Sequence, residues 1–376
     1  MTAVDLLREL IRIPSVNPDG DPGTPHTGER DCANFVAEFL RSCDAEVSVE
    51  DVLPGRPNVL GRFPSQGKPK PRLLLAPHTD TVSVAGMTID PFGAELREGK
   101  VWGRGASDTK GSMAAMLVAL RECREMLTGL SHEIWFVGLV GEEAGQHGSK
   151  ALAAKEKFDF AIVGEPTRLQ IVHTHKGAVW LTLRARGRAV HASMPQNGEN
   201  AIEKMMDALE TLRRELRAGF ASQRDQTLGA PTFSIGTIQG GSKINIVPDF
   251  CEARVDIRTI PGQDLSPLAD SLENRFPGLE IRRRISAPLW TDPAHPVIGA
   301  LKSCGVGLAG APWFCDAAVL SEGGTPAVAM GPGSIEQAHT ADEWISVADL
   351  DAGVAFFTRF LQSLSQPEGD GRRPQA

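Results

Sequence analysis

The chain has 376 residues, 41% of them hydrophobic, and a formal net charge of −8 at pH 7. This length can bury a large core and favours two domains over one. The acidic balance argues against a surface that binds nucleic acid. No apolar run approaches the roughly 18 residues that cross a bilayer, and the six cysteines form no C-x-x-C pair. We therefore expect a protein of the reducing cytoplasm, without a nucleic-acid or membrane partner.

The N-terminal segments predict elements that precede the first candidate site. Residues 3–12 and 29–42 are typical of amphipathic helices, and residues 45–51 and 58–63 of two strands. Four later apolar runs indicate buried strands of a mostly parallel sheet. These runs are residues 72–76, 133–140, 158–163 and 326–330.

Imidazole and carboxylate side chains follow each of the four runs. A further acid, Asp108, lies in a glycine-rich loop ahead of a helix predicted at residues 112–127. Because ligands of open α/β sheets bind at the carboxyl ends of the strands, we expect these side chains to converge there. The residues after the runs are His78, Asp80, Glu142, Glu143, Glu165 and His339.

The chemistry of this set suits a divalent metal. Two histidines with three or four carboxylates match the ligands that Zn²⁺ and similar ions take in proteins. The number of acids is sufficient for two ions. The adjacency of Glu142 and Glu143 does not indicate which of them binds metal.

Residues 178–286 have a different pattern and predict an inserted α+β domain. Residues 178–186, 232–239 and 250–259 alternate as strands with one exposed face do, and helices are predicted at 200–217 and 264–276. The order of these elements is typical of the split βαβ, or ferredoxin-like, arrangement. We therefore predict one domain from residues 1–177 and 287–376, and a second from residues 178–286.

Five stretches of the sequence resemble the signature motifs of the M20 metallopeptidases. They are HTDTV, GRGASDTKG, GEEAG, VGEPT and QAHTADEW, in this order along the chain. The resemblance implies that His78 and Glu165 hold one zinc ion and that Glu143 and His339 hold another. It further implies the roles of three acids: Asp108 as the bridging ligand, Glu142 as the general base, and Asp80 as the residue that orients His78.

The inserted domain resembles the lid, or dimerisation, domain of the same family. This likeness implies that His191 reaches a catalytic centre, usually the partner subunit's, and stabilises the oxyanion of the tetrahedral intermediate. It also implies that Asn245 and Arg258 hold the carboxylate of the substrate. An Arg fork suits that task because it bonds both carboxylate oxygens at once. A homodimer through this domain is therefore expected.

Simpler interpretations remain for several of these residues. Asn245 and Arg258 could pair across a sheet, Glu165 could cap the segment after it, and the role of His191 depends on a dimer. The loop before residue 112 could hold a phosphate, but its Gly and Lys spacing does not fit the Walker pattern. A metal-binding protein without activity is also conceivable, although such a protein has no use for the free acid Glu142.

Taken together, the sequence predicts a zinc-dependent amidohydrolase that removes an acyl group from an N-acyl amino acid. It would carry two Zn²⁺ per subunit, with Co²⁺ or Mn²⁺ as substitutes. The stretch before and after His339 looks most like the acetylornithine deacetylase branch. Succinyl-diaminopimelate desuccinylase and carboxypeptidase G2-like or dipeptidase activities stay as alternatives.

Overall fold

The computed structural model describes residues 1–19 and 26–365, which divide into two compact units. The first unit comprises Met1–His173, Thr291–Ala309 and the chain from Cys315 onward. The second comprises Thr174–Trp290 and Gly310–Phe314. The first division of the chain thus lies four residues before the predicted boundary at residue 178.

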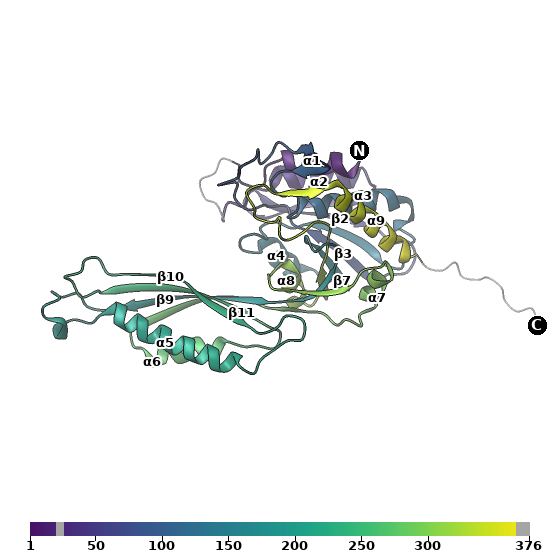
Figure 1. Cartoon of the computed structure of the whole chain (residues 1–376). Helices are drawn as coiled ribbons and strands as arrows, with labels where there is room; N and C mark the ends of the chain where they lie inside the picture. Colours follow the sequence, from purple (N-terminus) through teal and green to yellow (C-terminus); the bar gives the residue numbers. More distant parts are fainter. Residues whose placement is uncertain (20–25, 366–376) are drawn as a thin grey trace, which may run out of the picture. The chain divides into compact units, whose positions relative to one another are not determined.

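A mixed sheet forms the centre of the first unit (Figure 1), in the order β1-β2-β6-β3-β7-β15-β8. The inner strands β6, β3, β7 and β15 are parallel, as predicted, whereas β1, β2 and β8 pair in the antiparallel sense. The strands are β1 (Glu46–Leu53), β2 (Arg56–Phe63), β3 (Arg72–Pro77), β6 (Glu133–Gly138), β7 (Phe160–Gly164), β8 (Ile171–His175) and β15 (Ala327–Ala329). Two short strands, β13 (Leu289–Trp290) and β14 (Leu308–Ala311), pair with β8.

The register of the inner strands brings their carboxyl ends to one level. Leu75 of β3 lies opposite both Phe136 of β6 and Ile162 of β7. Pro77 pairs with Gly164, and the next residue, His78, forms a parallel bridge with Leu139. The segments that follow β3, β6 and β7 therefore leave the sheet side by side.

Helices cover both faces of this sheet (Figure 1). On one side, α3 packs against α1 and α9, and α2 packs against β1 and β2; on the other, α4 packs against α8. The apolar faces of α1, α2, α3, α7 and α9 form a continuous core with the sheet. The helices are α1 (Ala3–Arg12), α2 (Arg30–Arg41), α3 (Lys110–Leu127), α4 (His147–Lys155), α7 (Pro296–Ser303), α8 (Asp316–Glu322) and α9 (Val347–Ser363).

A separate three-stranded antiparallel sheet joins two distant parts of the first unit. It consists of β4 (Glu95–Arg97), β5 (Lys100–Trp102) and β16 (Trp344–Ser346), with β5 in the middle. Trp344 of β16 lies opposite Trp102 of β5. This pairing places the chain just before β16 beside the loop that follows β5.

The second unit is a four-stranded antiparallel sheet with two helices. Its order is β10-β11-β9-β12, so β10 and β12 are the edges. The apolar side chains of its strands and helices form a separate core. Its elements are β9 (Gly177–Arg186), a single 3₁₀ turn η1 (Pro195–Asn197), α5 (Ala201–Phe220), β10 (Thr232–Gly240), β11 (Phe250–Thr259), α6 (Ser266–Arg275) and β12 (Leu279–Ser286).

Within both described ranges, no helix combines the length and the apolarity that a bilayer span requires.

Candidate metal centre

Two groups of metal-ligand side chains meet at the carboxyl ends of the inner strands. His78, Asp108 and Glu165 form one group, and Asp108, Glu143 and His339 form the other. The ligand atoms within each group lie within 4.8 Å of one another. The five residues predicted as ligands are therefore brought together, and Asp108 belongs to both groups.

Asp108 faces one histidine with each of its carboxylate oxygens. Its Oδ1 lies 3.0 Å from His78 Nε2, and its Oδ2 lies 3.4 Å from His339 Nε2. His339 Nε2 also lies 3.0 Å from Glu143 Oε2. This geometry is what a bridging carboxylate between two cation sites needs.

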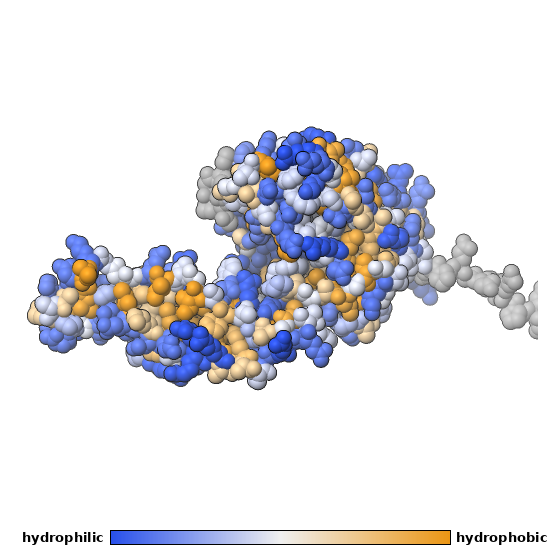
Figure 2. Space-filling model, in the orientation of Figure 1, coloured by the Kyte–Doolittle hydropathy of each residue, from blue (hydrophilic) through white to orange (hydrophobic). Residues whose placement is uncertain are grey.

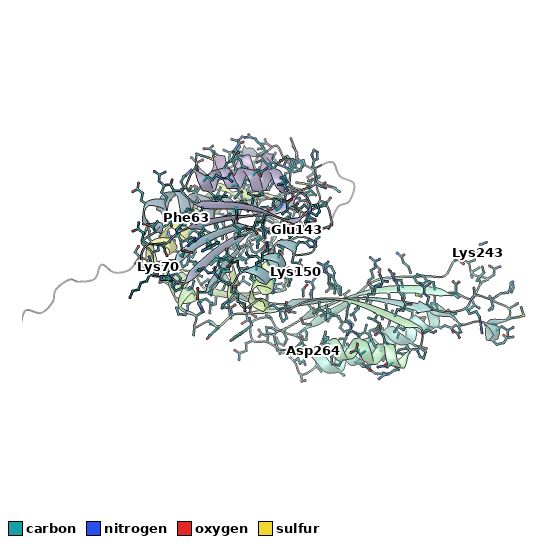
Figure 3. All side chains as sticks on the ribbon, turned by 180° about the vertical axis from the view of Figure 1, so that it is seen from behind. Phe63, Lys70, Glu143, Lys150, Lys243 and Asp264 are labelled. Atoms are coloured by element: carbon teal, nitrogen blue, oxygen red, sulfur yellow. The ribbon has the colours of Figure 1, made fainter. Side chains whose placement is uncertain are left out.

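The sheet and its loops position each of these side chains. His78, Glu143 and Glu165 follow β3, β6 and β7, and Figure 3 marks Glu143 beside the sheet of the first unit. Asp108 lies two residues before α3, and Thr109 Oγ1 donates to Gly164 O at 2.5 Å. His339 has a backbone φ of +62°, a conformation uncommon for residues other than glycine and often found at functional sites.

Asp80 holds the turn that carries the acidic pair. Its Oδ1 accepts the backbone N–H groups of Gly141 and Glu142, and its Oδ2 that of Glu143, all at 3.0 Å. His78 Nδ1 lies 2.9 Å from the backbone carbonyl oxygen of Asp80, but 3.6 Å from the carboxylate. The contact of Asp80 with His78 thus runs mainly through its main chain, whereas its carboxylate organises the Glu142–Glu143 turn.

The carboxylates of the centre are buried against one another. Burial, and then the charge of Glu165, raises the pKa of Glu142 well above its ordinary value. Burial and the charge of Asp108 raise the pKa of Glu143 to about 7 and that of Glu165 well above its usual range. So many acids close together and largely shielded from solvent call for compensating positive charge.

The pKa values of the two histidines are also raised. Hydrogen bonds to Asp108 and Glu143 raise the pKa of His339 to about 10. Burial lowers the pKa of His78, but the hydrogen bond to Asp108 and the charges of the surrounding carboxylates together outweigh burial, so the pKa lies well above the ordinary value. Protonated imidazoles thus supply positive charge where cations would bind.

Two carboxylate oxygens of the centre have no hydrogen-bond partner among the described residues. Glu143 Oε1 and Glu165 Oε1 are buried without a hydrogen-bond partner. Buried polar atoms are normally satisfied, and a cation beside each group would satisfy these two. The donor set of imidazoles and carboxylates also fits Zn²⁺ or a similar ion.

Glu142 belongs to neither group, although its neighbour Glu143 belongs to one. It is buried, and its backbone carbonyl oxygen accepts a hydrogen bond from Gln146 Nε2 at 2.9 Å. Its charge interacts with those of Glu165 and Asp316. The centre therefore holds a buried acid outside both ligand groups.

Three buried residues near the centre had no predicted role. Asp316 accepts a hydrogen bond from Ser149 Oγ with one oxygen and leaves the other buried without a partner. Glu343 and Arg104 form an ion pair beneath the Asp108 loop, with 2.7 Å between Arg104 Nη1 and Glu343 Oε2. No local pattern marks these residues, because their partners lie far away in the sequence.

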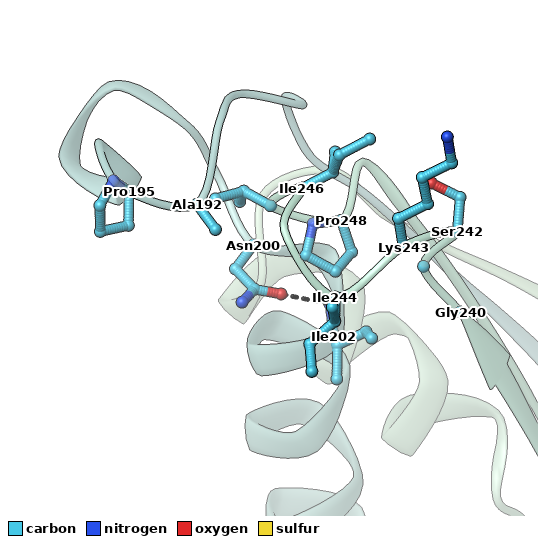
Figure 4. A pocket seen from close by; sticks show the side chains of 12 residues that line it. Ala192, Pro195, Asn200, Ile202, Gly240, Ser242, Lys243, Ile244, Ile246 and Pro248 are labelled. Carbon is cyan, nitrogen blue, oxygen red and sulfur yellow. Dashed lines mark hydrogen bonds between the residues drawn. The ribbon is translucent and has the colours of Figure 1, made fainter.

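In the second unit, His191 and Asn245 lie on neighbouring loops. Ala192 N donates to Asn245 O at 3.0 Å, and His191 forms an antiparallel bridge with Ile246. Both residues are exposed. Figure 4 shows the adjoining pocket of about 520 Å³, which is lined by residues of the same two loops and of the start of α5.

Arg258 is not beside them. It lies near the end of β11, whereas the loop that carries Asn245 precedes the start of this strand at Phe250. At about 3.3 Å per residue, the eight residues between Phe250 and Arg258 span roughly 26 Å. Arg258 Nε and Nη2 donate to the two carboxylate oxygens of Asp256 at 2.8 and 3.0 Å, so its fork is engaged within the strand.

Comparisons with known proteins agree with this architecture. Residues 74–363 match the peptidase family M20/M25/M40. The chain is 32% identical over 370 residues to an acetylornithine deacetylase of Proteus mirabilis (strain HI4320), covering 93% of each protein.

Solved structures of the same fold include an M20 family metallo-carboxypeptidase, Sso-CP2, from Sulfolobus solfataricus. It has a TM-score of 0.77 and 20% identity, over 96% of this chain and 99% of that one. The YXEP protein of Bacillus subtilis, described as a dinuclear metal binding peptidase, has a TM-score of 0.68 and 13% identity, over 96% and 98%. The match to this family covers more than half of the chain, which is sufficient to assign the chain to it. The protein therefore belongs to the peptidase family M20/M25/M40 and is a hydrolase that acts on amide bonds.

Proposed function

We propose that the protein removes the acyl group from an N-acyl amino acid, in the manner of an acetylornithine deacetylase. The observation that carries this proposal is the pair of ligand groups that share Asp108, with Glu142 outside both. The 32% identity to an acetylornithine deacetylase over nearly the whole chain supports this choice of substrate class.

The ligand groups would hold two divalent cations. His78 and Glu165 would bind one, Glu143 and His339 the other, and Asp108 both. Zinc suits these ligands best, and Co²⁺ or Mn²⁺ are suitable substitutes. Such ions polarise an amide carbonyl and acidify water when bound.

Glu142 supplies the proton transfer. Its carboxylate takes a proton from the water whose oxygen attacks the amide carbon, and it returns this proton to the nitrogen when the C–N bond breaks. The turn that Asp80 holds fixes the backbone of Glu142 while the side chain stays outside both ligand groups. A base that moves a proton twice must not be a permanent ligand, which is why this separation matters.

The second unit contributes to the site through a homodimer. The loop that carries Asn245 leads into Phe250, and Phe250 lies roughly 26 Å along β11 from Arg258, so His191 and Asn245 lie toward the other end of this strand from Arg258. We infer that His191 and Asn245 serve the partner's centre, where His191 stabilises the oxyanion. Arg258 would exchange Asp256 for the substrate carboxylate.

The edge of the second unit supports this assembly. Strand β10 is an unpaired edge, and Ile238 on it is 51% exposed. Met206 on α5 is 59% exposed, and Figure 2 shows hydrophobic side chains gathered along this unit. A long edge strand without charged residues is a template for pairing with a second strand.

A substrate panel tests the proposed specificity. N-acetyl-ornithine, N-succinyl-diaminopimelate, N-acyl-glutamates and dipeptides are assayed with the zinc-loaded and the cobalt-loaded protein. We expect the highest kcat/KM for N-acetyl-ornithine, since the closely matched sequence is a deacetylase of that substrate. A preference for dipeptides would instead assign a peptidase activity, and a preference for another N-acyl amino acid would keep the reaction but change the substrate.

Metal binding should release protons. The raised pKa values of Glu143, Glu165 and His339 mean that the metal-free centre holds protons near pH 7, and these must leave before the groups become ligands. Because a higher pH removes them in advance, the Kd for Zn²⁺ should fall as pH rises from about 6 to 8. Calorimetric titration of the metal-free protein in buffers of different ionisation enthalpy measures the release. Binding without proton release, and with a constant Kd, would contradict this expectation.

Substitution of the free acid separates catalysis from metal binding. Glu142→Gln should keep both ions but lower kcat by about 10²- to 10⁴-fold, the usual contribution of a general base. The matched control is Glu143→Gln, which should weaken one metal site. Metal content by mass spectrometry and steady-state kinetics measure both effects. Near-normal kcat in Glu142→Gln would exclude the assignment.

Mixed dimers test whether His191 acts on the partner. In the proposed dimer, each site takes Glu142 from one protomer and His191 from the other, so Glu142→Gln and His191→Ala each inactivate the homodimer. If the two variants are coexpressed, the heterodimer regains one site with both residues intact, and about one quarter of the wild-type activity should return. Activity no greater than that of the separate variants would place His191 in its own protomer's site or outside it.

A further inference from the structure

The carboxylate of Glu343 accepts four hydrogen bonds near the metal centre. It is fully buried and lies four residues after His339. Its Oε1 accepts the backbone N–H groups of Ser107 at 2.8 Å and Asp108 at 3.0 Å. Its Oε2 accepts that of Gly105 at 3.0 Å and a guanidinium N–H of Arg104 at 2.7 Å. Four donors from one loop therefore converge on a single side chain.

The short sheet explains how these distant segments meet. Strand β16 begins at Trp344 and pairs with β5, which ends at Trp102. Gly103 N donates to Glu343 O at 3.0 Å, which continues this pairing into the loop. Gly105, with a φ of +83°, then turns the chain so that successive N–H groups face the carboxylate.

Arg104 ties the same loop to the segment of His339. It is 3% exposed, and its Nη2 donates to Thr340 O at 3.2 Å, the residue after His339. Its Nε donates to Ser83 O at 3.2 Å. The charge of Glu343 is thereby compensated in the interior, and the ion pair has the additional hydrogen bonds that a buried pair needs.

We propose that Glu343 is a positioning residue that sets the distance between Asp108 and His339, and so the geometry of both cation sites. This inference rests on the proposed metal centre. Asp108 is the residue shared by the two ligand groups, so a rotation of its backbone displaces a ligand atom in each. Ligand sets tolerate displacements of only about 0.5 Å, and Glu343 bonds the backbone N–H of Asp108 directly.

A carboxylate is suited to this position because it only accepts hydrogen bonds. Every group that faces Glu343 in the loop is a donor. A glutamine has the same shape but turns an N–H₂ group toward one pair of these donors. Asp80 acts in the same way on the Glu142–Glu143 turn, where it accepts three backbone N–H groups.

The substitution Glu343→Gln tests this proposal. The affinity of the metal-depleted variant for Zn²⁺ is measured by competition with a chelator, and the Co²⁺-loaded form is examined by visible absorption. We expect both sites to lose about 10- to 100-fold in affinity, as is typical for outer partners of metal ligands. We also expect a lower kcat with little change in KM, and an altered Co²⁺ spectrum.

A matched control separates positioning from stability. Glu133 is also a buried carboxylate paired with an arginine, with 3.1 Å between Glu133 Oε1 and Arg62 Nε, but it lies at the opposite end of β6. Glu133→Gln should lower the Tm while the metal affinity and the Co²⁺ spectrum stay those of the wild type. Glu343→Asp keeps the charge on a shorter arm, and provides the same readouts with an intermediate effect if Glu343→Gln does not fold.

The outcomes distinguish this inference from the proposal on which it rests. If the wild type binds no divalent ions at this centre, the proposed function fails. If the wild type binds two ions, and Glu343→Gln and Glu343→Asp bind them with unchanged affinity and spectrum, the positioning role is overturned.

Discussion

The mutual repulsion of buried carboxylates is the constraint on which the rest of the structure depends. Asp108, Glu142, Glu143 and Glu165 lie together with His78, which is buried, and His339, which is exposed. Without cations, this site is satisfied only by protons, which is why Glu143 has a pKa of about 7 and His339 one of about 10. Burying these acids together lowers the free energy of unfolding, and bound cations would offset this cost.

The parallel strands solve the problem of bringing these groups together. Three neighbouring strands end at one level and release their polar residues there, while the core beneath is apolar. The loops are then held by acceptors rather than by packing: Asp80 bonds the turn after β6, and Glu343 the loop before α3. Rigid strands and bonded loops together give the preorganised geometry that catalysis requires.

Much of the site was predictable because its signals are local in sequence. An apolar run followed by an imidazole or an acid identifies His78 and Glu165 without knowledge of the fold. The residues alone did not separate the adjacent acids Glu142 and Glu143, and their roles came from the resemblance to the family. In the structure, Glu143 Oε2 lies 3.0 Å from His339 Nε2. Glu343 could not be found in this way, because its partners are backbone N–H groups more than 200 residues away.

Anomalous diffraction from crystals of the zinc-loaded protein tests most directly whether the five ligand residues hold two metal ions. Two anomalous peaks should lie at about 2 Å from the ligand atoms, one beside His78 and Glu165 and the other beside Glu143 and His339. Both should contact Asp108, and neither should contact Glu142. The absence of peaks at this position, or Glu142 coordinated in place of Glu143, would contradict the account.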